Sequence, residues 1–85
     1  MRTVTFHTKA FAEFTNWAQR DSKIFEKITR LITETIRDPF GGIGKPEPLR
    51  HELKGCWSRR ITDEHRLVYK VTEEAIIIVS CRYHY

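Results

Sequence analysis

Four side chains of this sequence have the types needed to cleave a phosphodiester bond in RNA: Glu47, Arg60, Arg66 and His84. A carboxylate can remove the proton of the 2′-hydroxyl group, and an imidazole can protonate the 5′-oxygen that leaves. Guanidinium groups can stabilise the negative charge of the pentavalent phosphorane. The reaction needs no metal ion, and the sequence has no His/Cys cluster that would supply four metal ligands. We therefore expect an acid–base site without a metal or another cofactor.

The two arginines are expected to lie close together on a β-hairpin. Residues 57–62 and 66–70 are rich in β-forming side chains and meet at a turn around residues 63–64. Because side chains alternate between the faces of a strand, Arg60 and Arg66 come within a few residues of each other across the hairpin. Two neighbouring guanidinium groups repel each other unless an anion or a carboxylate lies between them. The sequence leaves two interpretations open: an anion-binding pair, or two arginines that extend into water at a sheet edge.

Glu47 lies in a loop whose composition gives it a defined shape. Residues 40–48 contain three glycines and two prolines, which excludes a helix or a central strand. Prolines on both sides stiffen the backbone of Glu47, and Lys45 and Arg50 flank it in the sequence. A carboxylate surrounded by bases stays ionised and can act as a general base near an anionic substrate. The alternative is a surface carboxylate in a local ion pair.

His84 is the histidine that the sequence places best for proton transfer. It comes shortly after the apolar run 75–79, which is typical of a central strand buried on both faces, and we expect this strand to fix its position. His7 and His65 fall at a strand end and in a turn, and both are predicted to be solvated. The surroundings of His51, next to the loop rich in glycine and proline, stay undetermined.

The elements that must hold these residues follow from hydrophobic periodicity. In order, the predicted elements are a strand at residues 3–6, a helix from an N-cap at Thr8 to about Arg20, a helix from Asp21-Ser22 to Asp38, the hairpin, and a strand at residues 75–79. The predicted core of the helices includes Phe11, Phe14, Trp17, Ala18 and Phe25. The order β-α-α-β-β-β predicts an α+β fold, in which a two-helix hairpin packs on a mainly antiparallel sheet.

Length and composition limit the chain to one domain, residues 1–85. The net charge of +4 and the pI near 9.3 favour an anionic partner such as nucleic acid. No apolar stretch is long enough to span a membrane, and no signal-peptide core follows Met1, so we expect a cytoplasmic protein. Cys56 and Cys81 lack CxxC spacing and are expected to be reduced, packed thiols.

Several motifs, in the same order along the chain, resemble those of the YoeB toxins of the RelE superfamily. They are GKPEPL at residues 44–49, GCWSRRI at 55–61, EHRLVY at 64–69 and CRYHY at 81–85. They are spread over residues 44–85, and several independent motifs in register make the resemblance more specific than one short pattern. The sequence departs from the family at Ile43, where a basic or other polar residue is common, and at Cys56, where an aromatic residue is more usual.

The resemblance implies a RelE-like, microbial-RNase-like fold and a ribosome-dependent mRNA interferase. Such a toxin cleaves mRNA in the A site of the 70S ribosome and leaves a 2′,3′-cyclic phosphate or a 3′-phosphate. Carried over by position, Glu47 resembles the general base, His84 the general acid and Arg66 the group that stabilises the transition state. The phosphate- and substrate-binding residues that the resemblance implies are Lys45, Arg50, Arg60 and Tyr85.

The same resemblance implies protein partners. A YefM-type antitoxin would wrap the toxin with its C-terminal segment and block the site, and operator DNA would be bound only through the antitoxin complex. Homodimers are common in the family, and the sequence neither indicates nor excludes one. Two other functions stay open: a basic module that binds RNA or the ribosome without cleaving, and a degenerate toxin that acts only in a repressor complex.

Overall fold

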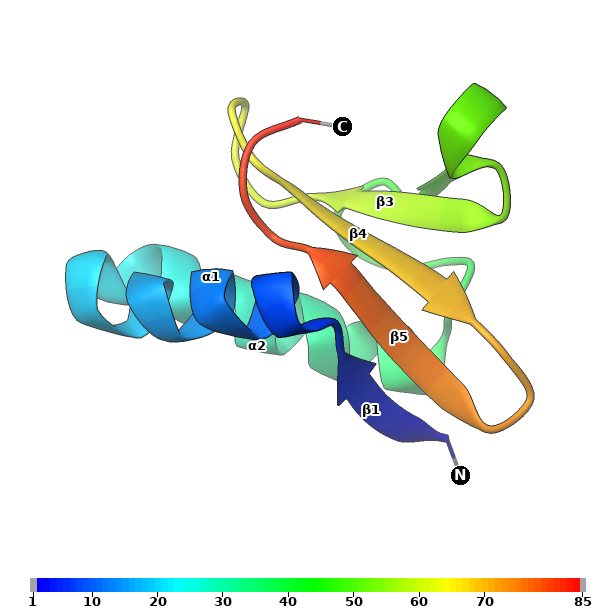
Figure 1. Ribbon diagram of the computed structural model, residues 1–85, viewed down its shortest axis with the longest axis horizontal. Coiled ribbons are helices and arrows are strands. Elements are labelled where there is room, and N and C mark those ends of the chain that lie inside the picture. Colours follow the sequence, from blue (N-terminus) through cyan, green and yellow to red (C-terminus); the bar gives the residue numbers. More distant parts are fainter. Residues whose placement is uncertain (1, 85) are drawn as a thin grey trace.

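The computed structural model describes residues 2–84 of the chain. Its elements are, in order, β1 (Thr3–Phe6), α1 (Thr8–Arg20), α2 (Ser22–Arg37), β2 (Glu47–Pro48), the 3₁₀ helix η1 (His51–Leu53), β3 (Cys56–Arg60), β4 (Arg66–Val71) and β5 (Ala75–Ser80). The two helices run side by side (Figure 1) and pack on one face of the sheet. The predicted α+β class and the predicted order of the main elements are confirmed.

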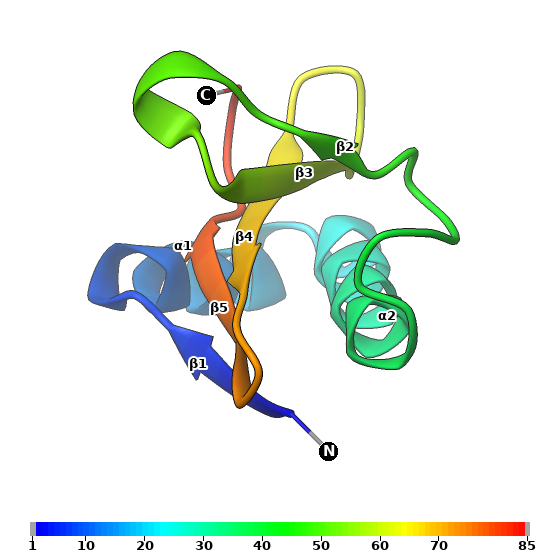
Figure 2. The same ribbon diagram turned by 90° about the vertical axis from the view of Figure 1, so that its right-hand side faces the viewer.

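The five strands that the described residues form have the spatial order β1-β5-β4-β3-β2. Only β1 and β5 are parallel, and the other three pairs are antiparallel, so the prediction of a mainly antiparallel sheet is confirmed. The short strand β2 was not predicted; it lies at the edge of the sheet beside β3 (Figure 2). An edge strand tolerates proline because one of its sides needs no ladder hydrogen bonds, which explains how Pro48 fits there.

The helix boundaries are set by capping. Asp21 accepts hydrogen bonds from the backbone N–H groups of Lys23 and Ile24, at 3.1 and 3.2 Å, and so caps α2 as predicted. The predicted N-cap at Thr8 is wrong, because Thr8 is already the first residue of α1 and His7 occupies the cap position without a side-chain hydrogen bond. The second helix ends before Asp38, since a residue that precedes a proline avoids the helical conformation.

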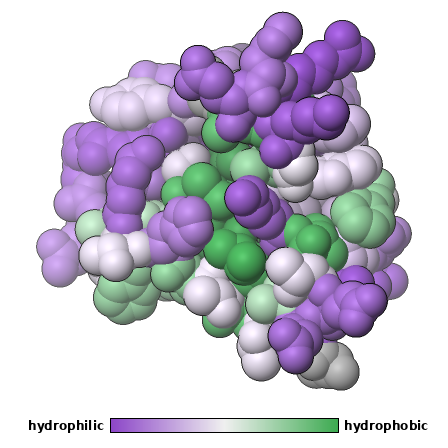
Figure 3. Space-filling view, turned by 45° about the vertical axis from the view of Figure 1, so that its right-hand side comes forward, coloured by the Kyte–Doolittle hydropathy of each residue, from purple (hydrophilic) through white to green (hydrophobic). Residues whose placement is uncertain are grey.

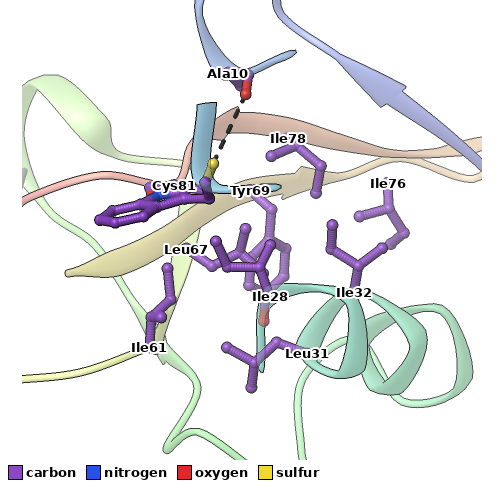
Figure 4. Close-up of a cluster of buried hydrophobic side chains, with 11 residues drawn as sticks. Ala10, Ile28, Leu31, Ile32, Ile61, Leu67, Tyr69, Ile76, Ile78 and Cys81 are labelled. Atoms are coloured by element: carbon purple, nitrogen blue, oxygen red, sulfur yellow. Dashed lines mark hydrogen bonds between the residues drawn. The ribbon is translucent and has the colours of Figure 1, made fainter. Parts of the chain in front are cut away.

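The core lies between α2 and the central strands β4 and β5. Figure 4 shows α2 side chains facing those of both strands. The fully buried hydrophobic members that these three elements supply are Ile28 and Leu31 of α2, Leu67 and Tyr69 of β4, and Ile76 and Ile78 of β5. On α1 the inward stripe is formed by Ala10, Phe14 and Trp17, at helical spacing. Phe11 and Ala18 were predicted as core, but both are exposed because they lie one position past that stripe.

A second, smaller cluster covers the face of the sheet that is turned away from the helices. It consists of Leu49, Cys56 and Val68, with Leu53 and Val79 packed against it. In the space-filling view, hydrophobic side chains on this side are framed by hydrophilic ones (Figure 3). The residues of β5 that point this way are only half-buried, so the prediction of a strand buried on both faces is wrong for this face.

Both cysteines are free, buried thiols, as predicted. Burial, with the nearby carboxylate of Glu13, raises the pKa of the Cys81 thiol to about 12, so this thiol stays protonated at neutral pH. Neither helix within residues 2–84 has the length and apolar character needed to cross a membrane.

Candidate active site

A cavity of about 260 Å³ brings together most of the candidate residues. It is lined by Lys45, Glu47, Ser58, Arg60, Arg66 and His84. These side chains come from the loop before β2, from β2, β3 and β4, and from residues 81–84 after β5, called the tail below. Three of them are permanent cations and one is a carboxylate, so the cavity has a net positive charge that attracts a phosphate group.

The two arginines lie directly opposite each other. Arg60 is paired with Arg66 in the register of β3 and β4, which confirms the predicted proximity across the hairpin. The Nη1 atom of Arg66 donates hydrogen bonds to the carbonyl oxygens of Thr62, Asp63 and His65. The hairpin turn therefore fixes one edge of this guanidinium group at the wall of the cavity. The Nη1 atom of Arg60 lies 3.9 Å from the exposed carboxylate of Asp63, a distance at which a surface pair is weak.

Glu47 is held by the edge strand. In β2 it is paired with Ser58 of β3, and the carbonyl of Gly44 accepts a hydrogen bond from the backbone N–H of Arg60 at 2.6 Å. These contacts fasten the segment on both sides of Lys45, whose backbone has a φ of 50°. Pairing with β3 thus adds to the stiffness that the flanking prolines give, and it points Glu47 into the cavity.

The end of the chain reaches the cavity by a different route from the one predicted. Strand β5 ends at Ser80, four residues before His84, and the tail then runs beside the turn between β3 and β4 (Figure 1). The backbone N–H of Arg66 donates to the carbonyl of Tyr83 at 3.0 Å, which joins the tail to the hairpin. The expectation that β5 itself fixes His84 is therefore wrong: contacts with the hairpin place it.

The imidazole of His84 is hydrogen-bonded to the hairpin turn. Its Nε2 atom lies 3.0 Å from the carbonyl oxygen of Asp63. A carbonyl oxygen can only accept a hydrogen bond, so Nε2 carries the hydrogen in this contact. The same carbonyl oxygen accepts a hydrogen bond from Nη1 of Arg66. One backbone oxygen thus holds His84, the candidate acid, next to Arg66, the candidate group for stabilising the transition state.

Four other residues complete the comparison of the predicted site with the structure. Arg50 does not line this cavity but an adjoining hollow of about 830 Å³ formed by residues 47–53, which Glu47 also borders. His65 was predicted to be solvated, but it is buried, because Trp17 and Tyr83 pack against its ring. Ser58 was not predicted to lie in the site. It shares a face of the strand with Arg60, but a serine in a strand does not by itself indicate a function. Tyr85 lies outside the described residues.

A buried arginine supports the loop that leads to Glu47. Arg59 is fully buried, and its guanidinium group donates hydrogen bonds to the carbonyls of Asp38 and Ile43 at 2.6 and 2.7 Å. Its Nε atom also donates to the hydroxyl of Tyr69, which donates in turn to the carbonyl of Pro39 at 2.8 Å. Burial raises the pKa of Tyr69, so this hydroxyl keeps its proton. Alternation along β3 puts Arg59 on the face opposite Arg60, but its burial could not be foreseen from its charge.

Gly44 provides a test of how this loop is held. Its φ is +84°, and a Cβ atom there would lie 2.9 Å from Cδ2 of Leu31 and 3.1 Å from Cβ of Arg59. We expect Gly44→Ala to lower the free energy of unfolding by about 2–4 kcal/mol, through both backbone strain and the clash. Gly55→Ala is the matched control, since Gly55 also has a positive φ but open space around it. Equal losses in urea titrations of the two variants would contradict this packing.

Comparison with known proteins places the chain in a family. The model of the YoeB-like toxin of bacterial type II toxin-antitoxin systems matches residues 6–85. Toxin YoeB of Mycobacterium bovis is 54% identical over 85 residues, which are 100% of each chain. A YoeB dimer from Staphylococcus aureus has a TM-score of 0.92 at 45% identity and covers 99% of this chain and 98% of its own.

The YoeB-YefM complex from Staphylococcus aureus has a TM-score of 0.91 at 43% identity, with coverage of 100% of this chain and 99% of the other. These likenesses extend over the whole fold, so the predicted RelE-like architecture is confirmed. They agree with the motifs, which are spread from residue 44 to the end of the chain. The protein belongs to the YoeB-like toxin family of bacterial type II toxin-antitoxin systems.

Proposed function

We propose that this toxin is a ribosome-dependent mRNA interferase, an endoribonuclease that cleaves mRNA in the ribosomal A site. The observation that carries the proposal is the shared cavity, in which a carboxylate, two guanidinium groups and an imidazole meet from separate segments. Membership of a toxin family fits an activity that stops translation.

In the proposed mechanism Glu47 removes the proton of the 2′-hydroxyl group, and the 2′-oxygen attacks the neighbouring phosphorus. Arg66, with Arg60 and Lys45, stabilises the added negative charge of the phosphorane. His84 acts in its protonated, imidazolium form: it gives a ring-nitrogen proton to the 5′-oxygen as the bond to phosphorus breaks, and the neutral ring remains. The products are a 2′,3′-cyclic phosphate and a 5′-hydroxyl group, and no metal ion takes part in these steps.

Two further residues are proposed to bind the message outside the scissile phosphate. Arg50 borders the adjoining hollow, where its charge would hold a phosphate next to the one that is cut. Tyr85 is proposed as a substrate contact on the resemblance of the CRYHY ending alone.

The proposed partners follow from the family. The S. aureus relative forms a YoeB-YefM complex, and we propose that a YefM-type antitoxin binds this chain and covers its site. Contact with operator DNA would occur only through that complex. A homodimer is the proposed free state, in line with the S. aureus YoeB dimer. The substrate is a message bound to ribosomes, so the toxin would act in the cytoplasm.

The proposal is tested by adding the purified protein to 70S ribosomes stalled on a defined message and mapping the message ends by primer extension. We expect cuts within the A-site codon that disappear when the nucleotide at the cut carries a 2′-deoxy sugar. Arrest of translation with an intact message would instead identify a module that binds without cleaving. No arrest and no cleavage, with binding to the antitoxin, would identify a toxin that acts only in a repressor complex.

A further inference from the structure

His65 is a buried histidine beside the cavity that does not line it. Only 6% of its surface is exposed. Its ring meets Trp17 edge-on, with centroids 4.8 Å apart, and lies 5.3 Å from the ring of Tyr83. It follows the turn between β3 and β4 and so lies where α1, the hairpin and the tail meet.

The contacts of this imidazole define where its hydrogen lies. The backbone N–H of Tyr83 donates a hydrogen bond to Nδ1 of His65 at 2.7 Å. A nitrogen that accepts a hydrogen bond carries no hydrogen, so the neutral ring has its hydrogen on Nε2. The Nε2 atom lies 3.5 Å from a carboxylate oxygen of Glu64, a partner that suits an N–H group.

The backbone that His65 holds is strained. Tyr83 has a φ of 59°, in the left-handed region that side chains other than glycine rarely adopt. Its N–H donates to His65 and its carbonyl accepts from the N–H of Arg66, so both backbone groups of Tyr83 are hydrogen-bonded to the hairpin. Strain of this kind persists where surrounding contacts hold it, and here it turns the chain so that His84 reaches the carbonyl of Asp63.

Two residues before Tyr83, the tail is held by α1. The N–H of Cys81 donates to the carboxylate of Glu13, and its carbonyl accepts from the indole N–H of Trp17, both at 2.9 Å. The tail is therefore fixed in two places before His84: Cys81 is bound to α1, and Tyr83 is bound to His65 and Arg66. The contacts of Tyr83 are next to the candidate acid, and His65 supplies the one that comes from a side chain.

We propose that His65 is a positioning residue, a neutral hydrogen-bond acceptor that sets the backbone of Tyr83 and thereby aims His84 at the scissile phosphate. Its role in cleavage rests on the proposed function, whereas its hydrogen bond to the backbone of Tyr83 does not. It follows that the side chain at position 65 needs an acceptor at the place of Nδ1 and does not need an imidazole as such.

Two variants separate these requirements. His65→Asn carries an oxygen at the same place along the side chain as Nδ1, and His65→Leu fills the site without an acceptor. We expect the leucine variant to lower kcat on ribosome-bound message about tenfold or more, with little change in KM, because a lost backbone hydrogen bond misplaces the acid. The asparagine variant is expected to stay within about threefold of wild type.

A double-mutant cycle tells a positioning role from a general loss of structure. In a His84→Gln background, the change His65→Leu is expected to lower the residual cleavage no further, since His65 acts through His84. An equal loss in both backgrounds, or a leucine variant with full activity, would overturn the proposal.

Amide hydrogen exchange on the isolated protein tests the hydrogen bond between Tyr83 and His65 without any cleavage assay. The amide of Tyr83 is expected to exchange slowly in wild type and in His65→Asn, and faster in His65→Leu. Equal protection in all three proteins would overturn the proposal. If the wild type cleaves no message but the Tyr83 amide still exchanges faster in His65→Leu than in the other two proteins, the proposed function is refuted. The role of His65 in holding the tail is then still supported.

Discussion

Glu47→Gln is expected to slow cleavage of ribosome-bound message by about 10²–10⁴-fold, the usual contribution of a general base. Glutamine has the shape of glutamate but cannot take the proton of the 2′-hydroxyl group. The side chain is exposed at an edge strand, so the free energy of unfolding is expected to change by less than about 0.5 kcal/mol. Single-turnover rates and urea titrations measure the two quantities.

The control for this variant is Glu73→Gln. Glu73 is an exposed carboxylate in the turn between β4 and β5, at the other end of β4 from the cavity, and its replacement removes the same charge from the protein. It is expected to leave the cleavage rate unchanged. Equal losses for the two variants would mean that overall charge and not proton transfer is responsible, and Glu47 would lose its assigned role.

Arg59→Met is expected to lower the free energy of unfolding by about 3–5 kcal/mol, because it removes three hydrogen bonds from a charged donor. The carbonyls of Asp38 and Ile43 would lose these hydrogen bonds to the guanidinium group. This is a large part of the roughly 5–15 kcal/mol that holds a small domain together. Urea unfolding followed by tryptophan fluorescence measures the loss.

Arg60→Met is the matched control for stability, since Arg60 is the next residue of the same strand and is exposed. It is expected to change the free energy of unfolding by less than about 0.5 kcal/mol, although it should weaken binding of the message. A similar loss of stability in both variants would show that the buried network of Arg59 does not hold the loop.

Local patterns in the sequence predicted much of the fold. The alternation in residues 57–70 predicted the hairpin and brought Arg60 and Arg66 within a few residues of each other, because a strand has one fixed side-chain period; their exact pairing came from the fold. Asp21 before an apolar stripe predicted the start of α2 for an equally local reason. The glycines and prolines before Glu47 indicated a shaped loop, but they carry no sign of the edge pairing that completes it.

What the sequence could not predict depends on contacts between residues far apart in the chain. The burial of His65 comes from Trp17 and from the tail, 48 and 18 residues away. The route of the tail to the hairpin likewise needs Glu13, which binds a residue 68 positions away. Polar residues at such positions look solvated in the sequence, and only the fold supplies the partners that make their burial favourable.

The central claim is that Glu47 and His84 act on the same phosphodiester as base and acid. It is tested most directly with a message whose scissile 5′-oxygen is replaced by sulfur, since a thiolate (thiol pKa ~8.5) leaves without the protonation that the far more basic oxygen leaving group requires. We predict that this substrate restores near wild-type cleavage to His84→Gln but not to Glu47→Gln. Failure of sulfur to rescue the His84 variant, or equal rescue of both variants, would contradict the claim.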